Sequence, residues 1–433
     1  MSSTNFDCIQ HTVQASYIRQ YPRATAHSQE EELRVAVKQY KPRHEPQPGD
    51  VTILACHCNG FPKELYEPVW DALYDYTQRE NAGFRIRGIW IMDVANQGES
   101  ALLNEGKLGN EPSWHDFARD YMSVISQFRA EMPRPLVGLG HSMGGSVILD
   151  LALLHPRLLT SVITVEPIAG STQHGGQWTS VAQILFRKDK WRSPEAAMEY
   201  FRKAPLHKRW HPKVLELYHQ HGFMNLPARG EPGLSQDAAG VTLKTSRHQE
   251  ALNFARASFP ASPDHGLETI RFDRRCHPEI VGVGNEPGNP MYRPESTTIF
   301  KQLPSLRPSC LLIYGTESTF SETSALRRKE KMEAIGTGPG GSGGAPEGRV
   351  KEMNVKGSHW LPFEQPLEFA QTVGAWLGEE MMRWRTLEVQ DNEAWSATPM
   401  DRRSTVSADW SYWMTKLFVR PKPIAKDTAR ARL

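Results

Sequence analysis

The sequence predicts an α/β fold with a mostly parallel central sheet, helices on both faces of that sheet and a mainly helical lid insertion. Short apolar segments alternate with segments of helical periodicity over residues 33–165 and again over residues 310–385. This alternation is typical of parallel strands joined by crossover helices. Residues 169–306 break the rhythm, because they are polar and rich in helix formers. We therefore expect one α/β core that is interrupted by an insertion.

The core elements are expected in a regular order, with strands as short apolar runs and helices marked by apolar residues three or four apart. The expected strands are 33–40, 51–55, 84–94, 136–140, 162–165, 310–314 and 350–355. The expected helices are 65–76, 114–132, 143–154, 323–334 and 366–385. The chain then divides into a first core part (1–168), the lid insertion (169–306), a second core part (307–389) and a polar C-terminal tail (390–433).

The composition argues against several classes of protein. Of the 433 residues, 39% are hydrophobic and 23% are charged, and the net charge is +2. A charge this close to zero gives no general field that attracts nucleic acid. The five cysteines lack the spacing of a disulfide framework, which favours a reducing compartment. We recognise no secretory signal and no apolar run of the roughly 18 residues that a membrane-spanning helix needs.

The clearest motif is Gly-His-Ser-Met-Gly at residues 140–144. An apolar strand is expected before it and an apolar helix after it, which is the setting that a Gly-x-Ser-x-Gly motif needs. The outer glycines permit a turn so tight that Ser142 adopts a strained backbone conformation. This turn lifts the hydroxyl above the sheet, near the N-terminus of a helix. Ser142 is therefore the predicted nucleophile.

A serine hydroxyl becomes a good nucleophile only when a base accepts its proton. His359 follows the last expected strand and precedes the last expected helix, which is where the base belongs in this arrangement. Other histidines lie in the expected insertion, where packing or solvated roles are more common: His207, His211, His219 and His221. His359 is the predicted general base.

Two glutamates are candidates for the acid that orients this base. Glu166 ends the strand after the elbow helix, and Glu317 ends the strand after the insertion. Both lie at carboxyl ends of strands, where α/β folds gather their reactive groups. We favour Glu166, because it directly follows a β-branched run and would be costly to bury without a cation or a histidine beside it. Glu317 is the alternative acid.

The negative oxygen that forms during acyl transfer needs two backbone N–H donors. Met143 is expected to supply one, because it directly follows the nucleophile. The second is expected from residues 57–62, the loop after the strand at 51–55.

Three other signals are weaker. Residues 56–58 read Cys-His-Cys, too closely spaced for a usual zinc site and without a second pair, so no metal is expected. The glycine-rich residues 336–348 follow a helix and lack the Gly-Lys-Ser/Thr ending of a phosphate loop, so we expect no cofactor there. A basic cluster consists of Arg187, Lys188, Lys190 and Arg192. We interpret it as a solvated face, with steering of a phosphate-bearing substrate as the alternative.

The sequence ends in Ala431-Arg432-Leu433, which is close to the Ser-Lys-Leu peroxisomal signal. The preceding residues 418–430 contain prolines and basic residues and little to bury. An exposed, flexible end is what an import receptor requires. We therefore expect the peroxisomal import receptor as a partner and the peroxisomal matrix as the compartment.

Several further segments resemble one family. Residues 93–100 resemble, in loosened form, the Asp-x-x-Gly-x-Gly-x-Ser loop of α/β-hydrolases, whose nucleophile elbow the motif at 140–144 also resembles. A narrower match comes from residues 62–70, 132–138, 154–158, 292–295 and 340–344. These are similar to a group of fungal toxin-biosynthesis α/β-hydrolases that includes the peroxisomal acyl-CoA hydrolase of mycophenolic acid biosynthesis. The resemblance covers nearly the whole chain.

This resemblance implies the α/β-hydrolase fold and assigns further residues. The family's acid follows the strand after the elbow helix, which carries over to Glu166, although the family has aspartate there. Residues 59–62 resemble the family's His-Gly-Phe-Pro loop with Asn59 in place of histidine, which implies Phe61 N–H as the second oxyanion donor.

The activity implied by the resemblance is hydrolysis of an acyl-CoA thioester in toxin or secondary-metabolite synthesis, through an acyl-enzyme on Ser142. The residues by themselves indicate serine hydrolase chemistry. An esterase or acyltransferase acting on a pathway intermediate is the alternative, as is a catalytically inactive scaffold. A homodimer is compatible with the sequence.

Overall fold

The computed structural model describes residues 5–171, 178–226, 240–259, 262, 264, 266, 278–279, 291–320 and 323–418 of the chain. The C-terminal residues Ala431, Arg432 and Leu433, on which the targeting prediction depends, lie outside this set. The chain forms two compact units, Met1–Met382 and Arg383–Leu433.

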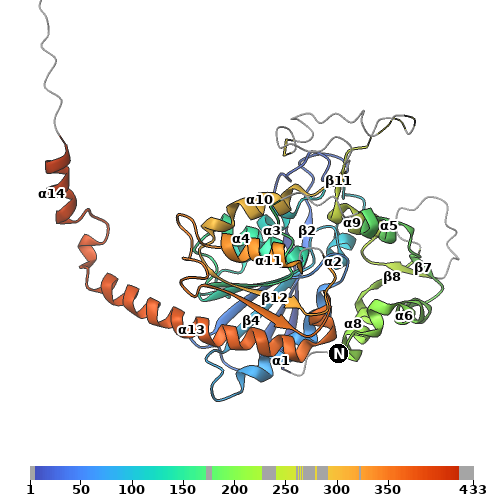
Figure 1. Ribbon diagram of the computed structural model, residues 1–433, viewed down its shortest axis with the longest axis horizontal. Coiled ribbons are helices and arrows are strands. Elements are labelled where there is room, and N and C mark those ends of the chain that lie inside the picture. The colour runs from blue at the N-terminus through green and yellow to red at the C-terminus, as the bar shows by residue number, and fades with distance from the viewer. Residues whose placement is uncertain are drawn as a thin grey trace, which may run out of the picture. The chain divides into compact units, whose positions relative to one another are not determined.

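The first unit is built on an eight-stranded sheet in the order β1-β2-β4-β3-β5-β6-β12-β13 (Figure 1). Its strands are β1 (Phe6–Gln14), β2 (Arg34–Pro42), β3 (Val51–Cys56), β4 (Ile86–Met92), β5 (Leu136–His141), β6 (Ser161–Val165), β12 (Ser309–Gly315) and β13 (Val350–Val355). In this order, the strands from β4 to β13 pair in parallel. Near one edge of the sheet, β2 pairs antiparallel with both of its neighbours, β1 and β4. The predicted fold class, a mostly parallel sheet covered by helices, is confirmed.

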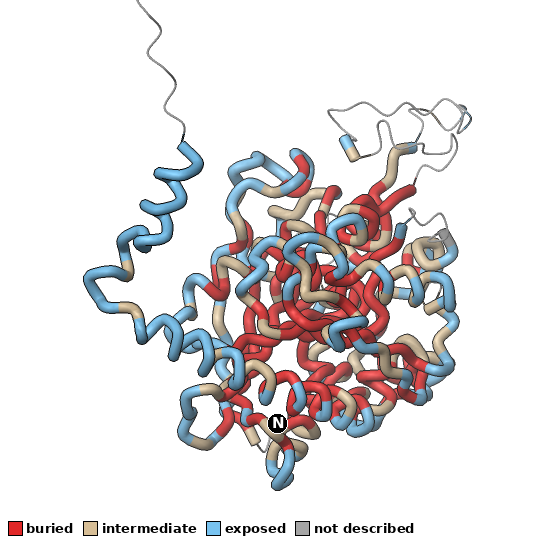
Figure 2. Tube along the Cα trace, turned by 60° about the vertical axis from the view of Figure 1, so that its left-hand side comes forward, coloured by how far each residue is buried: buried red, intermediate tan, exposed pale blue. Residues whose placement is uncertain are grey.

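Alternate residues of the central strands face two separate hydrophobic cores, because side chains in a strand point to opposite faces in turn. In β3, for example, Ile53 and Ala55 belong to one core, while Leu54 and Cys56 belong to the other. Burial on both faces explains why these strands are continuous apolar runs rather than alternating ones. Figure 2 shows the resulting buried interior.

Helices cover both faces of the sheet (Figure 1). Buried side chains of two helices, α1 (Glu67–Thr77) and α13 (Pro366–Ser396), belong to one core. Those of three others belong to the second core: α3 (Trp114–Gln127), α4 (Met143–Leu154) and α10 (Pro294–Gln302). Further described helical elements of the first unit outside the insertion are η1 (Lys63–Tyr66), α2 (Gly98–Leu103), η3 (Leu303–Ser305), α11 (Ala325–Ala334) and α12 (Leu361–Glu364).

A helical insertion separates β6 from β12, as predicted. It contains α5 (Trp178–Phe186), α6 (Pro194–Lys203), α7 (Pro205–Lys208), α8 (Pro212–His221) and α9 (Arg247–Phe254). Ser193 caps α6 by accepting the N–H of Ala196, as expected for a serine before a first-turn proline. The insertion also carries short strands that the sequence analysis does not predict: β7 (Lys190–Trp191), β8 (Phe223–Asn225), β9 (Val241–Leu243), β10 (Arg256–Ala257) and β11 (Met291–Tyr292).

Several elements differ from expectation. Strand β1 is not predicted, because its sequence is largely polar and it gains its place by pairing with β2 at the sheet edge. Helix α3 ends at Gln127 rather than at residue 132. Helix α10 lies inside the range expected for the insertion but packs on α4 of the core. The domain boundaries themselves stay a prediction.

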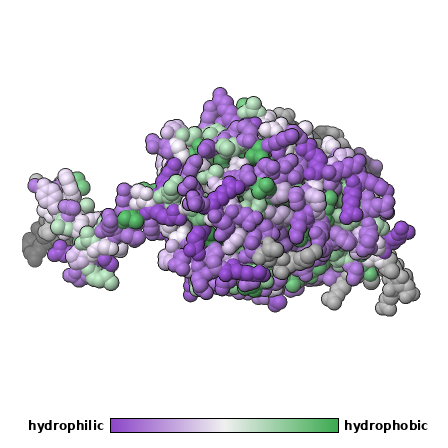
Figure 3. Space-filling model, turned by 90° about the horizontal axis from the view of Figure 1, so that it is seen from below, coloured by the Kyte–Doolittle hydropathy of each residue, from purple (hydrophilic) through white to green (hydrophobic). Residues whose placement is uncertain are grey.

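The second unit contains the end of α13, which continues to Ser396 beyond the expected residue 385, followed by η5 (Met400–Arg402) and α14 (Ala408–Leu417). Within the described residues, no helix is both long and apolar enough to cross a membrane. The surface drawn in Figure 3 is mostly hydrophilic, with hydrophobic residues scattered across it.

Candidate active site

The sharpest bend in the chain lies between β5 and α4, at Ser142. Its backbone has φ 56° and ψ −118°, a positive φ that non-glycine residues rarely adopt. Space is the reason for the flanking glycines, because a Cβ on Gly140 would lie 2.3 Å from the Gly144 carbonyl oxygen. A Cβ on Gly144 would lie 2.3 Å from the carbonyl oxygen of Cys56. The predicted tight turn is present, and it presents Ser142 at the carboxyl end of β5.

The His359 ring lies between Ser142 and Glu166. Its Nε2 atom is 3.0 Å from Ser142 Oγ, and its Nδ1 atom is 2.6 Å from Glu166 Oε2. A carboxylate can only accept, so Nδ1 carries the proton and donates it to Glu166, which leaves Nε2 to accept from the serine hydroxyl. The structure therefore brings together the predicted nucleophile, base and favoured acid.

Glu166 is held firmly at the end of β6. Its side chain is fully buried, and its backbone also has a positive φ, 46°. Besides His359, the carboxylate accepts the Gly315 N–H at 2.8 Å and the Ser318 hydroxyl at 2.8 Å. A buried carboxylate is costly unless each oxygen is satisfied, and here both oxygens are.

Glu317, the alternative acid, lies elsewhere. Its carboxylate pairs with Arg209 of the insertion, and about two-fifths of its side chain is exposed. Arg209 also pairs with Glu364, whose carboxylate accepts the N–H and the hydroxyl of Ser358. Glu317 therefore helps to connect the insertion to the loop that carries His359, but it does not contact the imidazole.

A second imidazole, that of the fully buried His141, supports the site. His141 Nε2 lies 2.8 Å from the His359 carbonyl oxygen, to which it donates, so its Nδ1 accepts from the Tyr66 hydroxyl at 2.9 Å. The Tyr66 oxygen in turn accepts the Cys58 N–H at 3.0 Å. Burial and the nearby His359 lower the pKa of His141 well below its usual value. His141 therefore stays neutral and adds no positive charge beside a protonated His359.

The loop expected to supply an oxyanion donor is fixed from both sides. The Gly60 N–H donates to Gln97 Oε1 at 2.9 Å, and Gln97 in turn donates to Asn59. Asn59 Nδ2 donates to the backbone oxygen of Glu250 at 3.0 Å, so the residue that replaces histidine links this loop to the insertion.

The two N–H groups predicted as oxyanion donors belong to Phe61 and Met143. In the part of the chain that the structure describes, neither of them donates to a backbone or side-chain acceptor. Met143 is the first residue of α4, where a helix leaves its N–H groups without partners. Their role as an oxyanion hole remains a prediction.

The same arrangement of strands and loops occurs in known proteins. The profile of the alpha/beta hydrolase family matches residues 53–372. The chain belongs to this family. The type I acyl-CoA thioesterase mpaH of Penicillium roqueforti is 40% identical over 414 residues, which cover 90% of this chain and 91% of that protein. The type I acyl-CoA thioesterase mpaH′ of Penicillium brevicompactum is 39% identical, covering 91% and 92%.

A solved structure supports the fold independently. The peroxisomal alpha-beta-hydrolase Lpx1 of Saccharomyces cerevisiae superposes with a TM-score of 0.66 at 15% identity, covering 96% of each chain. The resemblance to fungal α/β-hydrolases and the assignment as a hydrolase are confirmed by these relatives and by the family match.

In this α/β hydrolase, an aromatic wall connects the insertion to the site. The Phe61 ring lies 5.2 Å from Trp210 of the insertion and 5.0 Å from Trp360, the residue after His359. Phe363 lies 5.0 Å from Trp210 as well. Edge-to-face pairs of this kind add to the stabilisation by burial. The wall encloses the predicted oxyanion donor Phe61 with apolar surface.

The Cys-His-Cys segment has a structural place in this hydrolase. His57 Nδ1 lies 2.7 Å from the Cys58 carbonyl oxygen, and its Nε2 accepts the Val94 N–H at 3.1 Å, so both ring nitrogens are occupied. Burial lowers the pKa of His57, and it raises the pKa of each flanking thiol, Cys56 and Cys58, to about 12. Within the described residues, no three metal-binding side chains form a group.

Sequence reasoning missed several supporting residues. Lys63 is almost fully buried and pairs with Asp93 at 2.7 Å and with Glu64 at 3.1 Å. Although burial would lower the pKa of Lys63, these two carboxylates raise it, so the ammonium stays charged. The Lys63–Asp93 ion pair joins the start of η1, directly after residues 57–62, to the loop after β4. The resemblance of residues 93–100 to a family loop was the available signal, whereas nothing in the sequence pointed to Tyr66 or His141 as supports.

His207 generates a prediction about stability and pH. It is buried in the insertion, and neither ring nitrogen has a hydrogen-bond partner among the described residues. Burial and the nearby Arg187 lower its pKa to about 4. Since an unfolded histidine titrates near 6.5, the unfolded state binds more protons between about pH 6.5 and 4, and stability falls as the pH falls. We expect His207→Phe to increase the free energy of unfolding at pH 5 and to make its dependence on pH shallower.

Urea unfolding of the wild type and the variant at pH 5, 6 and 7 measures this effect. His207→Leu also removes the titrating ring but packs less well among the aromatic side chains, so it should share the shallower dependence without the full gain in stability. An unchanged slope in both variants would contradict the prediction.

Proposed function

We propose that this α/β hydrolase is an acyl-CoA thioesterase of fungal secondary metabolism that acts through Ser142, His359 and Glu166. The observation that carries the proposal is the pair of hydrogen bonds made by His359, 3.0 Å to the serine oxygen and 2.6 Å to the glutamate. The first distance suits proton transfer from the serine hydroxyl to Nε2 of the ring. The second suits a hydrogen bond from Nδ1 that keeps the ring in the correct orientation. Acyl-CoA is the chosen substrate class because two relatives at about 40% identity are acyl-CoA thioesterases.

The first half of the reaction transfers the acyl group to the enzyme. Ser142 Oγ attacks the thioester carbonyl carbon while His359 Nε2 takes the hydroxyl proton. The carbonyl oxygen becomes negative and accepts hydrogen bonds from the N–H groups of Phe61 and Met143. The carbon–sulfur bond then breaks, the imidazolium gives its proton to the departing thiolate, and CoA leaves as the free thiol.

The second half consumes water. His359 removes a proton from a water molecule while the water oxygen attacks the carbonyl carbon of the acyl-enzyme. The ester bond to Ser142 breaks, the serine oxygen recovers the proton from His359, and the carboxylic acid is released. Glu166 stabilises the imidazolium in both halves without accepting its proton. Because His141 is neutral, it does not repel His359 when His359 is protonated.

The nucleophile is tested by product analysis. We expect the wild type to release free CoA and a carboxylic acid from at least one member of a panel of acyl-CoAs, and Ser142→Ala to lower kcat by about 10⁶. Mass spectrometry of the products and labelling by a fluorophosphonate are the measurements, with Ser142→Ala as the unlabelled control. Oxyester cleavage without CoA release would favour an esterase, and no labelling of Ser142 would favour an inactive scaffold.

The acid is tested by a matched pair of substitutions at two strand ends. Glu166→Gln is expected to lower kcat by about 10⁴, because the amide no longer stabilises the imidazolium or the correct tautomer of His359. Glu317→Gln removes the same charge from the neighbouring strand end and is expected to leave kcat within about threefold of the wild type, since its partner is Arg209. Steady-state kinetics of both variants decide the question. Equal losses would assign the two carboxylates a shared role and sink the choice of Glu166.

The compartment is proposed from the sequence alone. Ala431-Arg432-Leu433 resembles a peroxisomal address, which an import receptor reads on an accessible C-terminus. In a fungal cell, the full chain with an N-terminal fluorescent tag is expected to co-localise with a peroxisomal marker, and deletion of Leu433 is expected to disperse it. Co-localisation that survives the deletion would remove the tripeptide as the address.

A further inference from the structure

Buried amide side chains gather beside the loop of residues 57–62, and the proposed mechanism gives them no role. They are Asn59, Asn96, Gln97 and Asn253, and none of these residues is more than 8% exposed. The first three belong to loops of the core, whereas Asn253 belongs to α9 of the insertion. Burying an amide is costly unless its polar atoms find partners, so a group of four calls for a physical reason.

Three hydrogen bonds among these groups run in one fixed direction, because both ends of the series are backbone groups. The Glu250 carbonyl oxygen can only accept, so the Asn59 atom 3.0 Å away is the amide nitrogen. Asn59 Oδ1 then accepts from Gln97 Nε2, and Gln97 Oε1 accepts the Gly60 N–H at 2.9 Å. Neither amide can be turned over without bringing two donors or two acceptors face to face. The Gln97 side chain is therefore fixed in one orientation.

The residue that this series of hydrogen bonds holds is Gly60. Its φ is 90°, in the region that favours glycine. A Cβ there would lie 2.7 Å from Glu250 Cδ, so the carboxylate packs directly against Gly60. Arg187 holds that carboxylate in place and donates to it at 3.1 Å. The next peptide N–H is that of Phe61, the predicted oxyanion donor, so contacts that confine Gly60 also limit the direction of this N–H.

Two of the buried amides stand where the chain departs from the family patterns that it resembles. Asn59 replaces a histidine, and Asn96 occupies the first glycine position of the Asp-x-x-Gly-x-Gly-x-Ser pattern. Both side chains bind α9. Asn59 donates to the Glu250 backbone, and Asn96 exchanges two amide hydrogen bonds with Asn253, at 3.2 and 3.3 Å. The departures thus attach a helix of the insertion to two loops of the core.

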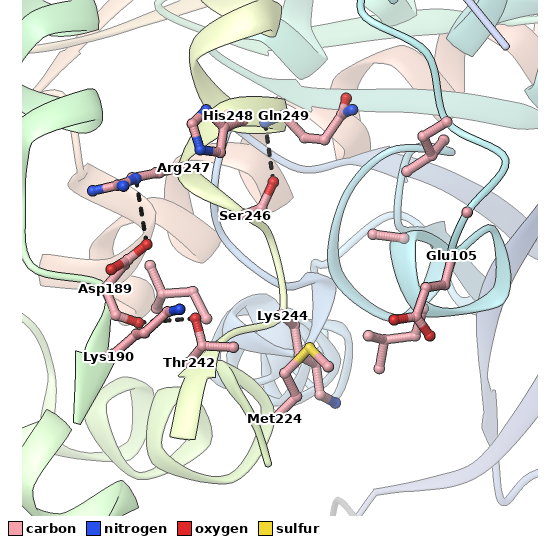
Figure 4. A pocket seen from close by; sticks show the side chains of 15 residues that line it. Glu105, Asp189, Lys190, Met224, Thr242, Lys244, Ser246, Arg247, His248 and Gln249 are labelled. Atoms are coloured by element: carbon pink, nitrogen blue, oxygen red, sulfur yellow. Dashed lines mark hydrogen bonds and ion pairs between the residues drawn. The ribbon is translucent and has the colours of Figure 1, made fainter. Parts of the chain in front are cut away.

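Helix α9 is itself well anchored, as Figure 4 shows for its start beside a pocket. Ser246 caps the helix by accepting the Gln249 N–H at 3.2 Å. The Gln249 side chain donates to the Gly109 oxygen of the core at 3.0 Å. Arg247 pairs with Asp189 of the insertion at 3.3 Å. The helix therefore offers the loop of residues 57–62 a rigid partner.

We propose that Gln97 is a positioning residue for the Phe61 N–H, and that α9 supports it through Asn59. Without these contacts a glycine samples many backbone conformations, and the N–H that follows Gly60 turns with them. Donors that are held in place before the reaction stabilise the negative oxygen without a cost during it. The inference rests on the proposed function and adds that the insertion takes part in transition-state stabilisation.

Steady-state kinetics of Gln97→Met in the full chain test this role. Methionine has nearly the same length but no N–H donor and only a weak acceptor. We expect kcat for acyl-CoA to fall at least about tenfold and KM to stay within about twofold, because the negative oxygen exists only in the transition state. A raised KM with unchanged kcat would place Gln97 in substrate binding and overturn the proposal. Urea unfolding checks that the variant is folded.

The matched control is Glu99→Gln. Glu99 pairs with Lys244 at 2.9 Å, so this substitution also removes a polar link between the core segment after β4 and the insertion. The pair has no contact with the loop of residues 57–62 among the printed ion pairs and hydrogen bonds of the described residues, and kcat is expected to stay within about twofold. An equal loss of kcat in both variants would reveal a general effect of loosening the insertion and overturn the role of Gln97.

Asn59→Ala breaks the same series of hydrogen bonds at its middle, and it decides the question if Gln97→Met does not fold. It is expected to lower kcat at constant KM as well. The loss in the double variant Asn59→Ala/Gln97→Met is expected to be clearly smaller than the product of the two single losses, because the side chains act as one unit. A loss equal to that product would show independent roles and remove the support through Asn59.

The rate of fluorophosphonate labelling of Ser142 separates this inference from the proposed function, since labelling uses the same oxyanion donors but no CoA. If the wild type releases no CoA and Gln97→Met still slows labelling at least about tenfold, the function fails and the positioning role stands. If the wild type hydrolyses acyl-CoA while kcat and the labelling rate of Gln97→Met stay within about twofold, the positioning role is wrong and the function stands. A wild type that is neither labelled nor active sinks both.

Discussion

The His359 ring bridges the ends of two neighbouring strands, and this bridge is the constraint on which the site depends. Ser142 follows β5 and Glu166 follows β6, and each has a positive φ that would be unfavourable in isolation. The Ser142 N–H donates to the Val165 oxygen at 2.8 Å, which fixes the two strand ends relative to each other. The ring arrives from the loop after β13. Because β12 lies between β13 and the strands that carry both partners, that loop must cross the end of β12 to reach them.

Support for this bridge comes from buried polar groups whose partners are all close by. His141 joins the His359 backbone to Tyr66, and Tyr66 joins His141 to the backbone of Cys58. One chain of hydrogen bonds thus connects the His359 loop, the elbow and the loop of residues 57–62. A satisfied buried network is rigid, because breaking any link leaves a desolvated polar group without a partner. Rigidity of this kind holds reacting groups in place without a cost at the moment of reaction.

The insertion supplies residues that surround the site in this hydrolase. It contributes rings against Phe61 and the guanidinium that pairs with Glu317. The α/β-hydrolase core supports many reactions, so substrate preference must come from what surrounds the common site. Here the aromatic wall lies where the insertion meets the loop that carries His359.

The sequence by itself determined the alternation of strands and helices and the chemistry of the elbow. It could do so because both are local: period and composition identify a buried strand, and only glycine fits the positions that flank Ser142. The edge strand β1 was missed for the complementary reason, since its polar sequence becomes a strand only by pairing with β2. The choice between Glu166 and Glu317 was equally beyond the sequence. Both end apolar strands, and only the packing of the folded chain shows that one carboxylate meets His359 while Arg209 engages the other. Contacts between residues far apart in the chain, such as those of His141 and Tyr66, leave no periodic trace, so the tertiary structure alone decided them.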